Sequence, residues 1–229
     1  MLRLCTYFTP THEAMAKRFV LSRAWGFDDR RHIKYGQTCP SGEFKSSGWN
    51  DCMLDKLNTL LNLPADGTPT LYVDADVCLM PSLVEWCRWY VEHLDDDEVA
   101  FSDDVIQWCA GIMLFRCTKR VHQFWRTLAD LCLAWDLPDQ DSLHQLRMQA
   151  DERKGVLPIR PRTLPRDVFC NWATVNAPTV PKPWNGEGFR VPPTCLAWHA
   201  NWTVGLSNKQ RMLERVVLGE TSDVAPQTA

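Results

Sequence analysis

Short apolar segments with strand character alternate with amphipathic segments of helical character along most of the chain. Strands are expected at residues 2–8, 32–36, 70–76, 98–104, 108–116 and 194–200, and helices at 12–25, 49–63, 81–94, 118–135, 137–148 and 207–218. Such alternation predicts an α/β fold, in which a mostly parallel central sheet is flanked by helices. Ligands of such folds bind at the carboxyl ends of the strands, so polar residues at those ends are the first candidates for function.

One segment breaks this alternation. Residues 156–193 contain eight of the fifteen prolines, and few regular elements tolerate that density of proline. A long irregular segment inside a compact domain is typically a functional loop. We therefore expect a single domain over residues 1–218 with a proline-rich loop at 156–193, followed by a flexible tail at 219–229.

The overall charge and the cysteine pattern exclude several classes of protein. The chain has 229 residues and a net charge of −3, so a non-specific affinity for nucleic acid is not expected. No stretch reaches the roughly 18 to 20 apolar residues that a membrane span needs. The ten cysteines are scattered singly and form no C-x-x-C pair, which favours buried reduced thiols over disulfides or structural zinc.

Two aspartates end the strand expected at 70–76. The stretch LYVDADV places Asp74 and Asp76 where the chain leaves the sheet, and side chains at i and i+2 of an extended chain point the same way. Neighbouring anions repel one another unless something positive lies between them, and a divalent metal is the simplest candidate. The alternative is that two solvated acids cap the end of a strand.

Three further motifs follow this pair in order. They are an A-G-I-M strand at 110–113, a D-Q helix start at Asp139 and Gln140, and an H-x-N-W…K pattern from His199 to Lys209. Together with D-x-D they resemble the nucleotide-diphospho-sugar transferases of the GT-A type, nearest to the retaining families 77 and 8. The resemblance covers roughly residues 2–217. It implies a GT-A fold with a Rossmann-like central sheet, a nucleotide-binding half at 1–107 and an acceptor-side half at 108–218.

A bound metal ion is part of what this resemblance implies. Mg²⁺ or Mn²⁺ held by carboxylates can clamp the diphosphate of a sugar nucleotide and act as a Lewis acid on the leaving group. Asp76 is assigned as a direct ligand, whereas the resemblance implies that Asp74 reaches the ribose or binds the metal through water, and that His199 is the third ligand. An imidazole beside two oxygens favours Mn²⁺. Without the resemblance, His199 is an ordinary core or edge residue.

Candidates for binding the sugar nucleotide come from several segments. Lys209 lies near the start of the last expected helix, where an ammonium group and free backbone N–H groups can face a diphosphate; an exposed lysine is the alternative. Tyr7 either stacks on the base, with uracil as the expected one, or belongs to the core. The full set of donor-binding candidates is Thr6, Tyr7, Thr9, Arg23, Lys56, Asp74, Ala75, Asp76, Ala110, Gly111, Asn201, Gly205 and Lys209.

The catalytic candidates are Asp139, Gln140, Asp103 and Asp104. The resemblance implies that Asp139 and Gln140 lie under the donor sugar, and an amide cannot accept a proton at neutral pH. A front-face mechanism with retention, in which the leaving phosphate oxygen takes the acceptor's proton, therefore fits better than a dedicated base. Inversion would need a carboxylate on the opposite face, from Asp103, Asp104 or Asp139. Asp139 also suits a helix N-cap.

The predicted function is transfer of a sugar from a nucleoside diphosphate, UDP being the expected one, to a hydroxyl of a glycan or glycoprotein. A sugar-1-phosphate nucleotidyltransferase is a second possibility, but YFTPTHEAMAK lacks the glycines expected of its phosphate loop. A non-catalytic lectin-like protein is a third. The reduced thiols favour the cytoplasm, with the catalytic domain of a longer Golgi-type enzyme as the alternative. The donor sugar, the acceptor and the oligomeric state stay open.

Overall fold

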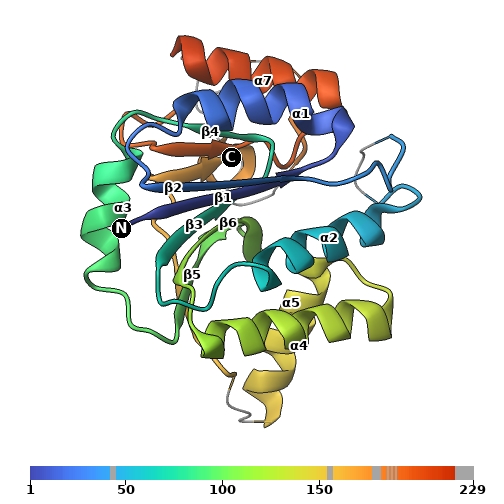
Figure 1. The fold of residues 1–229 in the computed structure, drawn as a ribbon. Coiled ribbons are helices and arrows are strands. Elements are labelled where there is room, and N and C mark those ends of the chain that lie inside the picture. The colour runs from blue at the N-terminus through green and yellow to red at the C-terminus, as the bar shows by residue number, and fades with distance from the viewer. Residues whose placement is uncertain are drawn as a thin grey trace.

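A six-stranded sheet forms the centre of the molecule (Figure 1). The computed structural model describes residues 1–41, 45–153, 157–176, 182–184, 186, 188 and 190–219. The sheet has the order β2-β1-β3-β6-β5-β7. Its strands are β1 (Arg3–Phe8), β2 (Asp29–Lys34), β3 (Pro69–Val73), β5 (Glu98–Asp103), β6 (Trp108–Arg116) and β7 (Arg160–Thr163). Only β6, among these strands, runs antiparallel to its neighbours, so the mostly parallel sheet expected from the sequence is confirmed.

A second sheet of three short strands lies beside the first. It has the order β4-β9-β8, formed by β4 (Val77–Leu79), β8 (Phe169–Asn171) and β9 (Ala197–His199). Strand β9 is antiparallel to β4 and parallel to β8. The chain passes from β3 to β4 through residues 74–76, so the two aspartates form the turn that joins the sheets.

Helices cover both sides of this double sheet (Figure 1). Helices α2 (Trp49–Leu61), α4 (Lys119–Trp135) and α5 (Asp139–Arg153) lie on one face of the large sheet. On the other side α7 (Leu206–Leu218) lies next to α1 (Glu13–Met15), and α3 (Leu83–Val91) lies at the edge. A short helix, α6 (Trp172–Asn176), follows β8.

The apolar residues form layers that follow the alternation of side chains along the strands. On β3, Leu71 and Val73 face the cluster between the two sheets, while Tyr72 faces the cluster under α2 and α4. In the small sheet, Val77 faces the apolar cluster between the two sheets, and Cys78 faces another apolar cluster, which lies beneath α7. Each strand of the small sheet is therefore buried on both faces, although it has only three residues.

Several elements differ from the sequence expectations. The single helix expected at 12–25 consists of four short elements. In chain order they are the 3₁₀ turn η1 (Pro10–His12), helix α1, the π-helical turn η2 (Ala16–Val20) and the 3₁₀ turn η3 (Leu21–Arg23). Strands β7 and β8 and helix α6 lie inside the proline-rich segment expected to be irregular. Proline is compatible with β7 because that strand lies at the end of the sheet order, where one side of the backbone needs no partner.

Other expectations concern the thiols, membrane spans and the tail. All ten cysteines lie within the described residues, are buried and form no disulfide, as predicted. In the same part of the chain, no helix is long and apolar enough to cross a membrane. Helix α7 ends at Leu218 with Gly219 in the left-handed conformation (φ 65°), which suits glycine at a helix C-cap. The expected tail lies, beyond Gly219, outside the described residues.

Leu114, in the middle of β6, provides a test of the layered core. Its side chain has no exposed surface, so Leu114→Ala is expected to lower the free energy of unfolding by about 2–5 kcal/mol. The control is Leu133→Ala on α4, where the leucine is 65% exposed and the change should stay within about 0.5 kcal/mol. Urea denaturation of both variants measures the difference, and equal losses would contradict the assigned core.

Candidate active site

Two backbone hydrogen bonds hold the turn between β3 and β4 from opposite sides. The N–H of Asp74 donates to the carbonyl of Gly111 on β6 (2.8 Å), and the N–H of Ala200, just after β9, donates to the carbonyl of Asp76 (3.0 Å). The turn is thus fixed to the large sheet at one end and to the small sheet at the other. This is why both carboxylates have defined positions.

His199 joins the two aspartates through the register of the small sheet. It is the residue of β9 opposite Val77, which immediately follows Asp76. Its Nε2 lies 3.2 Å from Oδ1 of Asp76 and 3.9 Å from Oδ2 of Asp74. Asp76 and His199 are buried and Asp74 is half-buried, with one ligand atom of each within 4.8 Å of the others. Two carboxylate oxygens and an imidazole nitrogen at this spacing fit a divalent cation.

Positive groups neutralise Asp76. Lys209, in the first turn of α7, places Nζ 2.6 Å from Oδ2 of Asp76. Burial alone would raise the pKa of Asp76, but Lys209 and His199 outweigh it and hold that pKa well below its ordinary value. Burial lowers the pKa of His199, whereas Asp76 and Cys109 raise it, and the net pKa lies well above the usual range.

A second cation lies beneath Asp74. Lys56 of α2 is buried, with Nζ 2.8 Å from Oδ2 of Asp139 and 3.2 Å from Oδ1 of Asp74. Burial lowers the pKa of Lys56, but the charges of Asp139 and Asp74 outweigh it, so the pKa is raised. The hydroxyl of Tyr72 donates to Oδ1 of Asp74 (2.8 Å). Lys56 therefore connects the aspartate turn to the start of α5.

Gly111 leaves the space that the site occupies. A Cβ added to it would collide with Cε1 of His199 and lie 2.7 Å from Nδ1 of that ring and 2.9 Å from Oδ2 of Asp74. The neighbouring Ala110 belongs to the apolar cluster under α2 and α4, because successive residues of a strand face opposite sides. Of the two small residues, Gly111 is therefore the one at the site.

Asp104, just after β5, is the centre of a hydrogen-bond network beside the triad. Its carboxylate accepts hydrogen bonds from Nε2 of Gln140 (2.7 Å), Nδ2 of Asn201 (2.8 Å) and Nε1 of Trp202. Burial raises the pKa of Asp104, and the N–H groups of Trp202 and Gln140 oppose that rise without cancelling it. Asp103 lies in a different environment, because its carboxylate accepts a hydrogen bond from Arg166 (2.6 Å).

Comparison with protein families identifies this arrangement. Residues 32–213, more than half of the chain, match the family described as nucleotide-diphospho-sugar transferase. The chain belongs to that family. It is a nucleotide-sugar glycosyltransferase with a candidate metal site at Asp74, Asp76 and His199. No curated protein matches its sequence.

Solved structures share the fold of this transferase at low sequence identity. A glycosyltransferase involved in the glycosylation of the major capsid of PBCV-1 has a TM-score of 0.56 and 10% identity, covering 93% of this chain and 98% of that one. The galactosyltransferase LgtC has a TM-score of 0.52 and 12% sequence identity, and the match covers 97% of this chain and 98% of LgtC. GlyE of Streptococcus pneumoniae TIGR4 has a TM-score of 0.56 and 11% sequence identity, and the match covers 92% of this chain and 59% of GlyE. The likeness confirms the expected GT-A fold.

The remaining donor-binding candidates of the transferase lie around β1 and α7. Tyr7 donates its hydroxyl proton to the carbonyl of Cys52 (2.7 Å) and meets Tyr35 edge to face. Thr6 is buried within β1, Thr9 is buried just after it, and Ala75 is buried in the aspartate turn. Gly205 precedes α7 with φ 84°. Arg23 donates to the carbonyl of Leu79, at the end of β4 remote from Asp76.

The sequence analysis missed two residues next to the triad of the transferase. Cys109 places Sγ 3.5 Å from Nδ1 of His199, and the half-buried His12 lies close enough for Asp76 to influence its pKa, which burial lowers. The alternation along β6 places Cys109 on the same face as Gly111, so a correct strand register was the signal for it. For His12 the only signal was its position just beyond β1.

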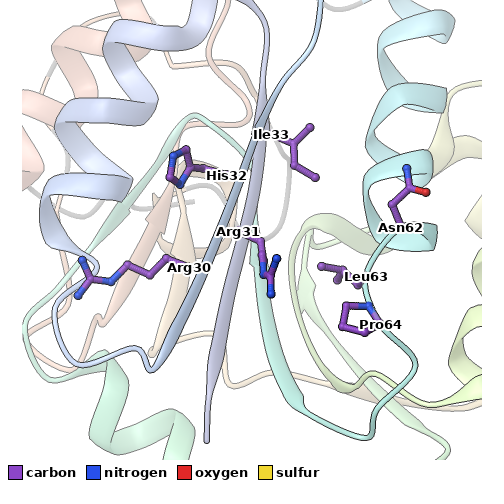
Figure 2. Close-up of a pocket in the computed structure, with 7 residues that line it drawn as sticks. All are labelled: Arg30, Arg31, His32, Ile33, Asn62, Leu63 and Pro64. Atoms are coloured by element: carbon purple, nitrogen blue, oxygen red, sulfur yellow. The ribbon is translucent and has the colours of Figure 1, made fainter.

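A pocket of about 260 Å³ lies at the edge of the large sheet (Figure 2). It lies between β2 and the end of α2, and Arg30, Arg31 and His32 contribute to its lining. Arg31 pairs with Asp29 (3.0 Å), and Arg30 lies over the ring of Trp25. None of its lining residues belongs to the candidate site of the transferase.

Gly111→Ala tests the need for space at the triad. The added methyl group is expected to displace His199 or Asp74 and to weaken binding of divalent cations by about 10–100-fold, as loss of supporting geometry typically does. Titration of Mn²⁺ into the purified protein measures this. The control is Ala110→Gly on the opposite face of β6, which should leave the affinity unchanged; equal affinities in all three proteins would contradict the assigned geometry.

Lys56→Met tests the buried charge cluster. Removing this cation leaves Asp139 and part of Asp74 buried without a counter-charge, so the free energy of unfolding should fall by about 3–5 kcal/mol. Lys34→Met is the matched control, because Lys34 is half exposed in its pair with Glu13 and its loss should cost less than about 1 kcal/mol. Thermal and urea unfolding compare the two variants, and a similar small loss in both would overturn the assignment.

Proposed function

We propose that this protein transfers a sugar from a UDP-sugar to a hydroxyl of a glycan or glycoprotein, depends on a divalent metal, and retains the anomeric configuration. The observation that carries the proposal is the convergence of Asp74, Asp76 and His199 on one point, with Lys209 at the same carboxylate. This cluster lies at the carboxyl ends of β3 and of β9, where an α/β fold binds ligands.

The residues of the triad would hold the metal, and Mn²⁺ is the expected ion because one of the three ligands is an imidazole. When bound, such an ion supplies charge neutralisation of a diphosphate and Lewis acidity towards the leaving oxygen. Asp76 and His199, which are buried, are the direct ligands in this proposal. Asp74 is also held by Tyr72 and Lys56, so it has less freedom to turn towards an ion.

Lys209 has a second role on donor binding. Its ammonium pairs with Asp76 at 2.6 Å, and it belongs to the first turn of α7, where backbone N–H groups lack helical acceptors. A diphosphate at this helix end would meet both the lysine and the positive end of the helix dipole. Lys209 then exchanges one anionic partner for another, which avoids leaving its charge unpaired.

Gln140 is the residue we place next to the reactive carbon of the donor sugar. Its Nε2 is the end that faces Asp104, because a carboxylate only accepts hydrogen bonds. The carbonyl oxygen is therefore the end of the amide left for a ligand. A carbonyl dipole directed at the anomeric carbon stabilises the positive charge that develops there as the glycosidic bond breaks.

Retention is supported by the environment of the three carboxylates that inversion would need as a base. Asp139 is buried against Lys56, Asp103 is bonded to Arg166, and Asp104 accepts three N–H donors. Although the raised pKa of Asp104 suits a base, its oxygens already accept hydrogen bonds from Gln140, Asn201 and Trp202. A front-face reaction needs no free carboxylate from the chain.

A pocket near the start of α5, the helix that carries Gln140, suits the acceptor. This pocket, of about 450 Å³, lies between the start of α2 and the turn from α4 to α5, and Asp51, Asp136 and Asp141 contribute to its lining. Carboxylates suit the hydroxyl groups of a sugar, which are hydrogen-bond donors. We place the acceptor glycan in this pocket, which is next to the start of α5.

Calorimetric titration of UDP tests the diphosphate site. Wild-type protein should bind UDP with Mn²⁺ and not with EDTA, and Asp76→Asn should weaken binding by at least about 100-fold because it removes a charged ligand. Asp66→Asn is the control, since Asp66 pairs with Arg3 instead. Metal-independent binding, or none with any divalent ion across UDP and GDP, would refute the proposed transferase site.

Gln140→Ala tests the catalytic role of the amide. Donor hydrolysis, with water in place of the acceptor, should slow by about 100-fold in kcat while UDP affinity stays unchanged. The control is Gln145→Ala, on the exposed side of the same helix, which should change neither the kcat of donor hydrolysis nor the affinity for UDP. NMR of the released sugar gives its configuration at early times, and an inverted product would disprove retention.

A further inference from the structure

The ring of His199 has a neighbour on each of its two nitrogens. Nε2 lies 3.2 Å from Oδ1 of Asp76, at the proposed metal position. Nδ1 lies 3.5 Å from Sγ of Cys109, on the inner side. Cys109 is 1% exposed and His199 is 6% exposed, so water does not compete for either contact.

The direction of this hydrogen bond depends on which nitrogen of His199 carries the hydrogen. Sγ of Cys109 also lies 3.4 Å from the backbone N–H of Gly111 and 3.7 Å from Nδ2 of Asn201, both of which donate to it. The sulfur therefore accepts from two donors, and its own S–H can still donate one hydrogen bond. Without an ion, Nε2 of His199 carries a hydrogen, because it faces a carboxylate oxygen of Asp76 that only accepts. A cation at Nε2 would take the lone pair of that nitrogen, which leaves the hydrogen of the neutral ring on Nδ1, within reach of Sγ of Cys109.

We infer that Cys109 is a positioning residue, which accepts the Nδ1 hydrogen of His199 and so fixes the tautomer whose Nε2 faces a divalent cation beside Asp76. The inference rests on the proposed function, because it gives a role to a residue that supports the metal site. Metal-binding histidines in general donate their other N–H to a fixed acceptor, which is usually an oxygen. Here the acceptor is a sulfur.

The same hydrogen-bond network extends to the catalytic amide. Nδ2 of Asn201 donates to Oδ1 of Asp104 as well as to Cys109, and Asp104 accepts from Gln140. The orientation of the metal ligand and that of Gln140 therefore depend on one set of contacts. A change at Cys109 acts on both ends of this set.

Mn²⁺ binding, followed by the electron paramagnetic resonance signal of the free ion, is the first test. Cys109→Ala removes the acceptor and should weaken Mn²⁺ binding by about 10–100-fold, whereas Cys109→Ser restores an acceptor and should recover most of the affinity. Cys132→Ala is the matched control, because Cys132 is also buried but lies in the apolar cluster under α4. It should bind Mn²⁺ like the wild type.

The tautomer itself is the second readout. Nitrogen NMR of histidine-labelled protein in the presence of Zn²⁺, a diamagnetic ion that imidazole and carboxylate groups bind, should show hydrogen on Nδ1 and none on Nε2 of His199 in the wild type and in Cys109→Ser. In Cys109→Ala at the same ion concentration, Nε2 should keep its hydrogen, because it stays paired with Asp76. If Cys109 had a purely structural role, Cys109→Ala would lower the stability of the protein without changing which nitrogen of His199 carries the hydrogen. Cys132→Ala measures the effect of losing a buried thiol alone.

The outcomes separate this inference from the proposed function. Wild-type protein that does not bind Mn²⁺ at all would refute the metal site. Tight wild-type binding that Cys109→Ala leaves unchanged would refute the role of Cys109 alone. Hydrogen found on Nε2 of His199 in the wild type loaded with Zn²⁺ would also refute it, because the thiol would then be the donor to Nδ1.

Discussion

The structure depends on the neutralisation of acidic groups at the junction of its two sheets. Three carboxylates, those of Asp74, Asp76 and Asp139, approach one another there, and Lys56 and Lys209 come from helices on opposite sides to pair with them. Neither lysine is close to its partners in sequence, so the fold itself brings the charges together. Without these partners the turn would be a cluster of like charges in a largely buried position.

The small sheet positions the remaining member of the site. A three-residue strand such as β9 gains little stability by itself, yet the pairing of β9 with β4 and β8 fixes His199 opposite Val77 and Asn171. Both faces of this sheet are covered, one by the large sheet and the other by α7. The position of the His199 ring is therefore determined by packing on both sides of a short strand.

The sequence alone predicted the parts of this molecule that local patterns encode. The alternation of strands and helices indicated the sheet, and LYVDADV indicated acids at a strand end. Strand β4 was missed because three residues are too few to show a period, and β7 because proline is a general signal against strands.

For the site, sequence patterns identified residue types but not their contacts. Asp104 and Gln140 were both candidates, but their hydrogen bond to each other depends on how α5 packs against the end of β5. Lys56 was a candidate for binding the nucleotide, and its pairing with two carboxylates could not be read from the sequence. Cys109 looked like any other buried thiol, because its contact with His199 joins residues 90 positions apart.

The distance in sequence between Asp76 and Lys209 has a consequence for how the protein is made. The two residues are 133 positions apart, and α7 is the last helix among the described residues. On the ribosome, the aspartate turn emerges long before its lysine and its histidine, so until then the turn has neither of these two partners. The final docking of α7 both covers the small sheet and completes the charge balance, which couples the end of folding to the assembly of the site.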